Sequence, residues 1–132
     1  GAGGAARAIA TALCAHGIGE LSILNRTQAN AEALVAALND KGGFNQAKSV
    51  ATHNGNDVDI VINATSKGMH ESDDLPLALD GVAADTVIAE IIMKPERTAW
   101  LADAEKRDLP THYGSHMLDC QVELIGKFMG AL

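Results

Sequence analysis

"GAGGAARAIA", residues 1–10, is the stretch of sequence that decides the fold. Gly1, Gly3 and Ala6 match the spacing G-x-G-x-x-(G/A) of a dinucleotide-binding turn that leads into a helix. The first glycine permits a tight turn, the second lets the backbone approach a pyrophosphate, and the small third residue lets the helix pack closely on a sheet. The helix N-terminus then offers N–H groups to the phosphates. Small residues also begin many ordinary helices, so a purely structural turn is the alternative.

The composition predicts one domain, residues 1–132, with a core of Ala, Val, Ile and Leu, because 47% of the residues are hydrophobic and only 3% are aromatic. The net charge of −7 argues against a nucleic-acid partner, which would need a basic surface. The sequence has no apolar run of about 18 residues and no signal peptide, so we expect no membrane association. Cys14 and Cys120 lie in apolar helical patterns. We expect buried free thiols in a cytoplasmic protein, with a disulfide as the alternative.

Helical and extended patterns alternate along the chain. Apolar spacing predicts helices over 5–16, 98–107 and 117–132. A further helix is predicted to begin after Thr27 as its N-cap and to end at Gly42-Gly43. Short apolar runs predict strands over 21–24, near Val50, and over 58–65, 86–93 and 111–113. This order predicts an α/β fold, a Rossmann-like doubly wound parallel sheet. Its first strand, which would precede the glycine turn, is expected to be absent from this chain.

The segment "LSILNRT", residues 21–27, indicates which dinucleotide is bound. In the glycine-turn fingerprint, an acidic residue about 20 positions further on binds the ribose hydroxyls of NAD. Here Asn25 and Arg26 occupy that place. An arginine at this point can pair with the 2′-phosphate of NADP and stack on its adenine. The alternative is that Arg26 is a solvated charge in the loop before a helix.

Four motifs occur in register along the chain: "GAGGAARA", "NRT", "INATSKGM" and "GSHML" followed by Gln121. Together they resemble the NADP-binding domain of the shikimate/quinate dehydrogenase family. The resemblance implies NADP as cofactor and reversible reduction of 3-dehydroshikimate to shikimate, or reaction of a close relative such as quinate or aminoshikimate. The expected partner is therefore a small cyclitol acid, and a homodimer is an open alternative for the assembly.

The resemblance also implies roles for individual residues. The diphosphate turn is expected at 1–5, the adenosine 2′-phosphate site at 25–27, and the strand end and loop beside the cofactor at 63–65. The nicotinamide end is expected near Ile91, Gly114 and Met117, and Gln121 is expected to reach the substrate hydroxyls. The full cofactor-binding set is Gly1, Ala2, Gly3, Gly4, Ala5, Asn25, Arg26, Thr27, Asn63, Ala64, Thr65, Ile91, Gly114 and Met117.

Two positions depart from the family pattern. The family often has a basic residue three positions after the "NRT" threonine, where this chain has Asn30. A weaker preference for NADP over NAD follows. Met93 stands where the family often has a tyrosine that contacts the substrate, so one hydroxyl contact is missing at this substrate-binding position. A shikimate-like paralogue with another substrate is therefore an alternative.

No residue of this chain matches the family's catalytic lysine and aspartate, which belong to an N-terminal substrate domain. We interpret Lys67 as a loop charge, and we expect the chain alone to bind cofactor without turning over substrate. His112 and His116 have a spacing that suits zinc on a helix, but Gly114 lies between them and a third ligand is missing. We therefore predict no metal site. A non-catalytic nucleotide- or shikimate-sensing module is the alternative function.

Overall fold

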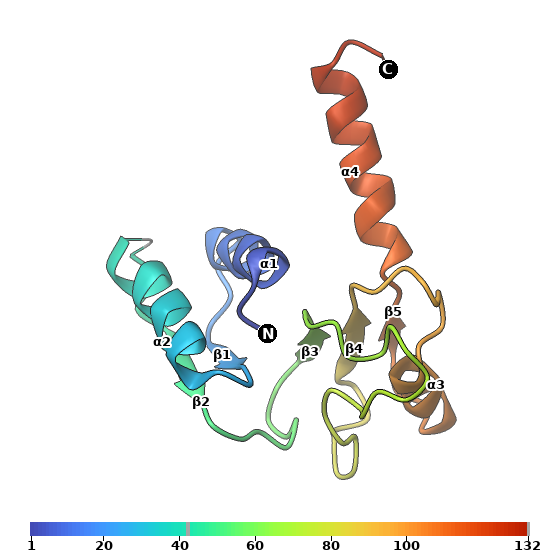
Figure 1. Cartoon of the computed structure of the whole chain (residues 1–132). Helices are drawn as coiled ribbons and strands as arrows, with labels where there is room; N and C mark the ends of the chain where they lie inside the picture. Colours follow the sequence, from blue (N-terminus) through green and yellow to red (C-terminus); the bar gives the residue numbers. More distant parts are fainter. Residues whose placement is uncertain (42, 132) are drawn as a thin grey trace. The chain divides into compact units, whose positions relative to one another are not determined.

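The computed structural model describes residues 1–41 and 43–131, which form two compact units, Gly1–His53 and Asn54–Leu132. Each unit combines helices with a small parallel sheet (Figure 1). The α/β class and the parallel strands predicted from the sequence are therefore confirmed. Gly42 and Leu132, which the sequence places at the ends of two helices, lie outside the described residues.

The first unit is a two-stranded sheet with two helical segments. Its elements are α1 (Gly4–Ala15), β1 (Leu21–Leu24), α2 (Gln28–Ala36), the π-helical turn η1 (Ala37–Lys41) and β2 (Ala47–Val50). β1 and β2 pair in parallel from Leu21 with Ala47 to Leu24 with Val50. Ala31, Leu34 and Leu38 are buried because their spacing places them on one face of the helical segment. That face packs against the sheet.

Gly17 ends α1. Its φ of +81° lies in the left-handed region that glycine adopts without strain. The Gly17 amide bonds to the Cys14 carbonyl and the Ile18 amide to the Leu13 carbonyl, which is the hydrogen-bond pattern of a Schellman stop. The chain therefore turns back toward β1 at Gly17, directly after the helix that the sequence predicts over 5–16.

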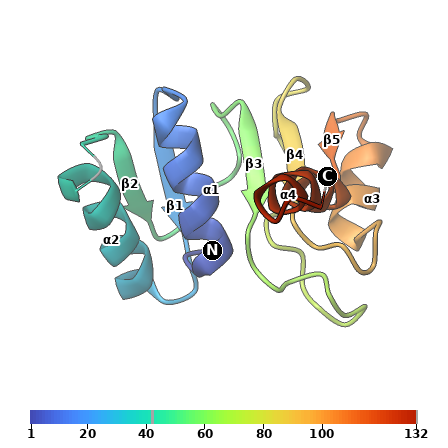
Figure 2. The same cartoon turned by 90° about the horizontal axis from the view of Figure 1, so that it is seen from above.

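The second unit contains β3 (Ile60–Asn63), β4 (Val87–Glu90), α3 (Ala99–Lys106), β5 (Thr111–His112) and α4 (Ser115–Phe128). The strands pair in parallel in the order β3-β4-β5, with α3 packed beside β4 and β5 (Figure 2). The core of this unit consists of buried side chains from β4, α3 and the loops before β4 and β5: Leu79, Ile88, Trp100, Leu101, Ala104 and Leu109. The loop before β4 is fixed to α3 by the Trp100 indole, which donates to the Leu77 carbonyl at 2.8 Å.

Four sequence predictions need correction. β3 spans Ile60–Asn63 and not 58–65, and the Thr65 amide donates to the Asn63 side chain instead of to a strand ladder. β4 ends at Glu90, not at Met93, because the amides of Ile91 and Ile92 donate to the Glu90 carboxylate and are not available to a strand ladder. α4 begins two residues earlier than predicted, and none of its residues is buried. It extends away from the sheet of its own unit (Figure 1). Both cysteines are free thiols, but Cys120 is exposed on α4 and Cys14 is only half-buried.

Within the described ranges, no helix is both long enough and apolar enough to cross a bilayer.

Candidate functional site

The glycine turn lies at the carboxyl end of β1. The Gly1 nitrogen donates to the carbonyl of Leu24, the last residue of β1, at 2.6 Å. Gly3 is the N-cap of α1 and supplies no side chain to the helix amides. A Cβ added at Gly3 or Gly4 would enter open space, so the surface in front of the helix is free for a ligand. Ala6 is buried, as the third position of the fingerprint requires.

The predicted 2′-phosphate residues occupy the turn between β1 and α2. The Asn25 side chain donates to the Thr27 carbonyl at 2.9 Å and so fixes the shape of this turn. Arg26 is exposed, and no described residue forms an ion pair or hydrogen bond with its guanidinium. Thr27 is the N-cap of α2, as predicted, but its hydroxyl makes no capping bond. The turn therefore presents a guanidinium, a hydroxyl and a helix N-terminus, and all three suit an anion.

The first turn of α2 contains no acidic residue. Asn30 is exposed there, and its amide bonds to the Thr27 carbonyl. An anion at Arg26 would therefore meet no negative side chain from this helix start. The charge pattern fits a phosphate, whereas a ribose diol would need a carboxylate at the same place.

In the second unit, Asn63 is the last residue of β3 and is buried. Its amide nitrogen donates to the Lys67 carbonyl at 2.9 Å and to both oxygens of Glu90 at 3.0 Å. Its amide oxygen accepts from the Thr65 amide at 3.1 Å and the Thr65 hydroxyl at 2.6 Å. Asn63 thus joins the end of β3 to the end of β4. It also shapes the loop that contains Ala64, Thr65 and Lys67.

Glu90 is the site residue that sequence reasoning missed. Its side chain is 2% exposed and also accepts from the Thr98 hydroxyl at 3.2 Å, the Ile91 amide at 2.9 Å and the Ile92 amide at 3.2 Å. The signal was present in the sequence, since a single carboxylate in the apolar run "TVIAEIIM" has to be paired when the run is buried.

Gly114 and Ile91, both predicted at the nicotinamide end, lie in contact. A Cβ added to Gly114 would stand 2.7 Å from the carbonyl carbon of Ile91 and 2.5 Å from the carbonyl oxygen of Ile92. Such distances exclude any side chain at position 114. Met117 is half-buried in the first turn of α4, where its amide bonds to the Gly114 carbonyl at 3.2 Å. The ends of β3, β4 and β5 in this unit therefore bring together Asn63, Ile91 and Gly114.

The predicted substrate residues are exposed. Met93 follows β4 with 42% of its surface exposed, and Gln121 is exposed on α4. Lys67 is exposed in the loop after β3. A hollow of about 460 Å³ opens beside that loop, lined by Gly68, Met69, His70, Glu71, Pro95, Arg97 and Ala99. It adjoins the carboxyl ends of β3 and β4, which is where parallel α/β sheets hold their ligands.

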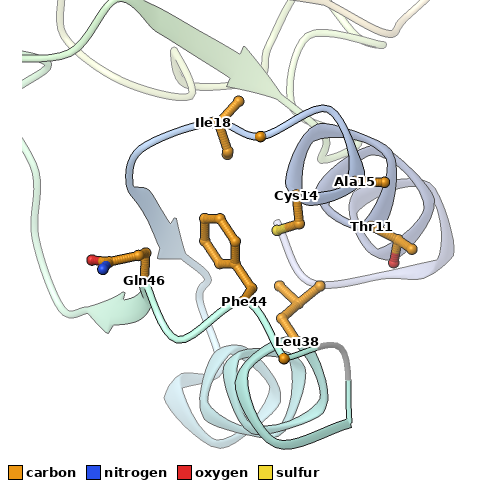
Figure 3. Close-up of a pocket in the computed structure, with 9 residues that line it drawn as sticks. Thr11, Cys14, Ala15, Ile18, Leu38, Phe44 and Gln46 are labelled. Carbon is orange, nitrogen blue, oxygen red and sulfur yellow. The ribbon is translucent and has the colours of Figure 1, made fainter.

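Another hollow, of about 420 Å³, lies in the first unit between the end of α1 and η1 (Figure 3). The side chains of Cys14, Leu38 and Phe44 point toward one another there. Ile18 and Gln46 place this hollow at the amino ends of β1 and β2, the end opposite to the glycine turn. Burial raises the pKa of the Cys14 thiol, so this cysteine is not an activated nucleophile.

A cluster of polar and charged side chains connects the segment after β4 to the residue after β5. Arg97, in the segment after β4, pairs with Glu105 of α3 at 2.7 Å, and Glu105 also accepts a hydrogen bond from the Tyr113 hydroxyl. The hydrogen bond from Tyr113, followed by that from Arg97, lowers the pKa of Glu105, and the same contact with Glu105 raises the pKa of Tyr113. Tyr113 adjoins Gly114, so the cluster fixes the backbone beside the predicted nicotinamide residues.

The rings of His112 and His116 lie with their centroids 4.8 Å apart. Within residues 1–41 and 43–131, no group of three histidine, cysteine, aspartate or glutamate side chains is arranged to hold a metal ion.

These features define a class of protein, the α/β domains in which a glycine turn and the carboxyl ends of parallel strands form the ligand-binding edge. Residues 1–71 match the family model for shikimate/quinate 5-dehydrogenase. The chain therefore belongs to the shikimate/quinate dehydrogenase family, as the sequence motifs predict.

Proteins of this family resemble the chain over most of its length. The NADP(+)-dependent shikimate dehydrogenase of Brucella ovis is 36% identical over 124 residues, which are 89% of this chain and 42% of the relative. Shikimate 5-dehydrogenase from Thermus thermophilus, solved with NADP(H) and shikimate, has a TM-score of 0.83 at 28% identity and covers 100% of this chain. That match spans 48% of the Thermus chain.

A relative with another substrate is equally similar in sequence. The 5-ketofructose reductase of Gluconobacter sp. strain CHM43 is 36% identical, with a TM-score of 0.79, over 89% of this chain and 44% of the reductase. The chain thus spans less than half the length of the curated relatives that it matches.

Proposed function

We propose that this chain binds NADP(H) and forms the cofactor-binding part of an oxidoreductase that interconverts 3-dehydroshikimate and shikimate. The proposal rests above all on the exposed, unpaired Arg26 beside the free hydroxyl of Thr27 at the start of α2. Bound NADPH would supply the hydride for reduction of the ketone.

The first unit would hold the phosphates of the cofactor. Gly1, Ala2, Gly3, Gly4 and Ala5 would face the diphosphate, because the turn is open and α1 begins there with unpaired amides. Asn25 would hold the shape of the next turn, while the Arg26 guanidinium and the Thr27 hydroxyl bind the 2′-phosphate.

The second unit would contribute the residues of the nicotinamide end. Asn63, Ala64 and Thr65 form the edge after β3, and Ile91, Gly114 and Met117 form the edge after β4 and β5. The close approach of Gly114 to the Ile91 and Ile92 backbone excludes a side chain at position 114 and holds the start of α4 against the end of β4, beside which the nicotinamide would lie. Gln121 would bind substrate hydroxyls. No residue of the chain is assigned as proton donor.

One observation favours a second substrate class. Met93 is exposed at the position where the family often has a substrate-binding tyrosine, and it offers no hydrogen-bond donor. A dehydrogenase that oxidises quinate, aminoshikimate or a related polyol, and reduces the corresponding ketone, is therefore the second candidate. The similarity to a 5-ketofructose reductase agrees with this candidate, because it shows that close relatives differ in substrate.

The cofactor assignment is tested by titrating the protein with NADP and NAD. We expect Arg26→Ala to weaken NADP binding about tenfold or more, the value of one lost charged hydrogen bond, and to leave NAD binding unchanged. Lys41→Ala, which removes an exposed positive charge from η1, is the matched control and should change neither affinity. Equal loss of NADP and NAD binding in Arg26→Ala would contradict the phosphate assignment.

The reaction is tested with the full-length protein and both cofactors against shikimate, quinate and aminoshikimate. Oxidation of shikimate with NADP supports the first candidate, and a preference for another polyol supports the second. Cofactor binding without oxidation of any of them would favour a nucleotide- or shikimate-sensing module.

We place the protein in the cytoplasm. Measurement of its mass in solution tests whether it forms a homodimer.

A further inference from the structure

The Glu90 carboxylate is the centre of the hydrogen bonds at the strand ends of the second unit. Its four donor groups, the Asn63 amide, the Thr98 hydroxyl and the amides of Ile91 and Ile92, are all uncharged. They come from the end of β3, the N-cap of α3 and the backbone after β4. A carboxylate can be buried without a positive partner only when hydrogen-bond donors satisfy its oxygens. Both oxygens of Glu90 have such donors.

The chemistry of a carboxylate fixes the orientation of Asn63. A carboxylate oxygen only accepts hydrogen bonds, so the NH₂ group of Asn63 has to face Glu90. The Asn63 oxygen then has to face the amide and hydroxyl of Thr65, where both contacts are satisfied. An amide flipped by 180° would oppose its oxygen to the carboxylate.

This orientation in turn fixes the proton of Thr65. The Thr65 hydroxyl donates to Asn63 and accepts from the Lys67 amide at 3.1 Å. A hydroxyl has one proton and two lone pairs, so one lone pair remains. Thr65 therefore presents an acceptor to a ligand, which matches a donor such as a ribose hydroxyl or a carboxamide NH₂ group and repels a phosphate oxygen.

We propose that Glu90 is a positioning residue, which orients Asn63 and leaves Thr65 as a hydrogen-bond acceptor for the nicotinamide-ribose half of the cofactor. The inference rests on the proposed function, because it assumes that this edge faces NADP. Glu90 itself is buried and need not touch the ligand. Glu90→Gln would place an NH₂ group among four donors and weaken the constraint on Asn63, whose NH₂ group would keep its hydrogen bond to the Lys67 carbonyl.

The test compares two ligands on the full-length protein, NADP and adenosine 2′,5′-bisphosphate, which lacks the nicotinamide half. In Glu90→Gln we expect NADP binding to weaken about tenfold while binding of the bisphosphate stays within about twofold of wild type. Glu96→Gln, which removes an exposed carboxylate from the same unit, should change neither value. Equal losses for both ligands would show a general structural defect and overturn the proposal.

A double-mutant cycle tests the route through Thr65. Since Glu90 is inferred to act through this hydroxyl, Glu90→Gln should cost less than about threefold in NADP affinity when Thr65→Val is already present. The same tenfold cost in both backgrounds would overturn the proposal.

If Glu90→Gln does not fold, Glu90→Asp and Thr98→Val are judged by the same ratio of the two ligand affinities. Failure of the wild type to bind NADP would refute the proposed function, whereas an unchanged Glu90→Gln protein would refute this inference alone.

Discussion

A Cβ atom on Gly114 would lie 2.5 Å from the carbonyl oxygen of Ile92, so the start of α4 and the backbone after β4 meet at a distance that only glycine permits. The neighbour is backbone, which cannot move aside as a flexible side chain would. Gly114→Ala should therefore destabilise the protein by about 1–3 kcal/mol and displace the Ile91–Ile92 backbone.

Thermal unfolding measures that loss, and NADP binding measures the displacement. Gly126→Ala, within α4 and away from the strand ends, is the control and should be neutral or slightly stabilising, since alanine suits a helix interior better than glycine. A Gly114→Ala protein as stable as wild type would show that the backbone contact is not required.

Asn30→Arg should increase the preference for NADP. Asn30 is exposed in the first turn of α2, near the turn that holds Arg26, and no acidic residue lies in that helix start. A second guanidinium would add a charged hydrogen bond to a 2′-phosphate, so we expect NADP to bind about tenfold more tightly and NAD to bind as before. Calorimetric titration of both cofactors measures this. A gain shared equally by NAD would indicate a general electrostatic effect.

The stability of the second unit should depend on pH through Glu105 and Tyr113. The folded pKa of Glu105 is lowered, so its contribution is present above its unfolded pKa of about 4.3 and is lost as the pH falls through the folded value. The folded pKa of Tyr113 is raised, so its contribution is present below its unfolded pKa of about 10 and is lost as the pH rises through the folded value.

Melting temperatures of wild type and Tyr113→Phe, measured from about pH 3 to about pH 11, check this. The difference between them should be largest in the middle of the range and should shrink at both ends. Glu96→Gln is the control. It removes an exposed carboxylate that has no hydrogen-bond partner in the described residues. A difference that does not vary with pH would mean that the Glu105–Tyr113 contact does not contribute.

Much of the fold could be predicted from local pattern. The bounds of β1 follow directly from the sequence, because a short apolar run stands between a glycine stop and the polar "NRT" turn. The place of Arg26 is predictable for the same reason, since the carboxyl end of a strand followed by a helix has to lie at the ligand-binding edge. The family pattern adds Gly114, and the structure supplies the physical reason, its contact with Ile91 and Ile92.

The hydrogen bonds of Glu90 could not be predicted in this way. Asn63 and Glu90 are separated by 27 residues, and only the pairing of β3 with β4 brings them together. The end of β4 could not be predicted either. The apolar residues after Glu90 continue the strand pattern, but their amides donate to the Glu90 carboxylate and not to a neighbouring strand. The exposure of α4 was also unpredictable, because its apolar spacing is that of a helix packed on a core.

Arg26 and Glu90 belong to different compact units and share no hydrogen-bond partner among the described residues. Substitutions at the two places should therefore change the free energy of cofactor binding additively. Under the proposed function, the first 53 residues would therefore set the choice between NADP and NAD, and that choice could be redesigned there without disturbing the strand ends around Glu90.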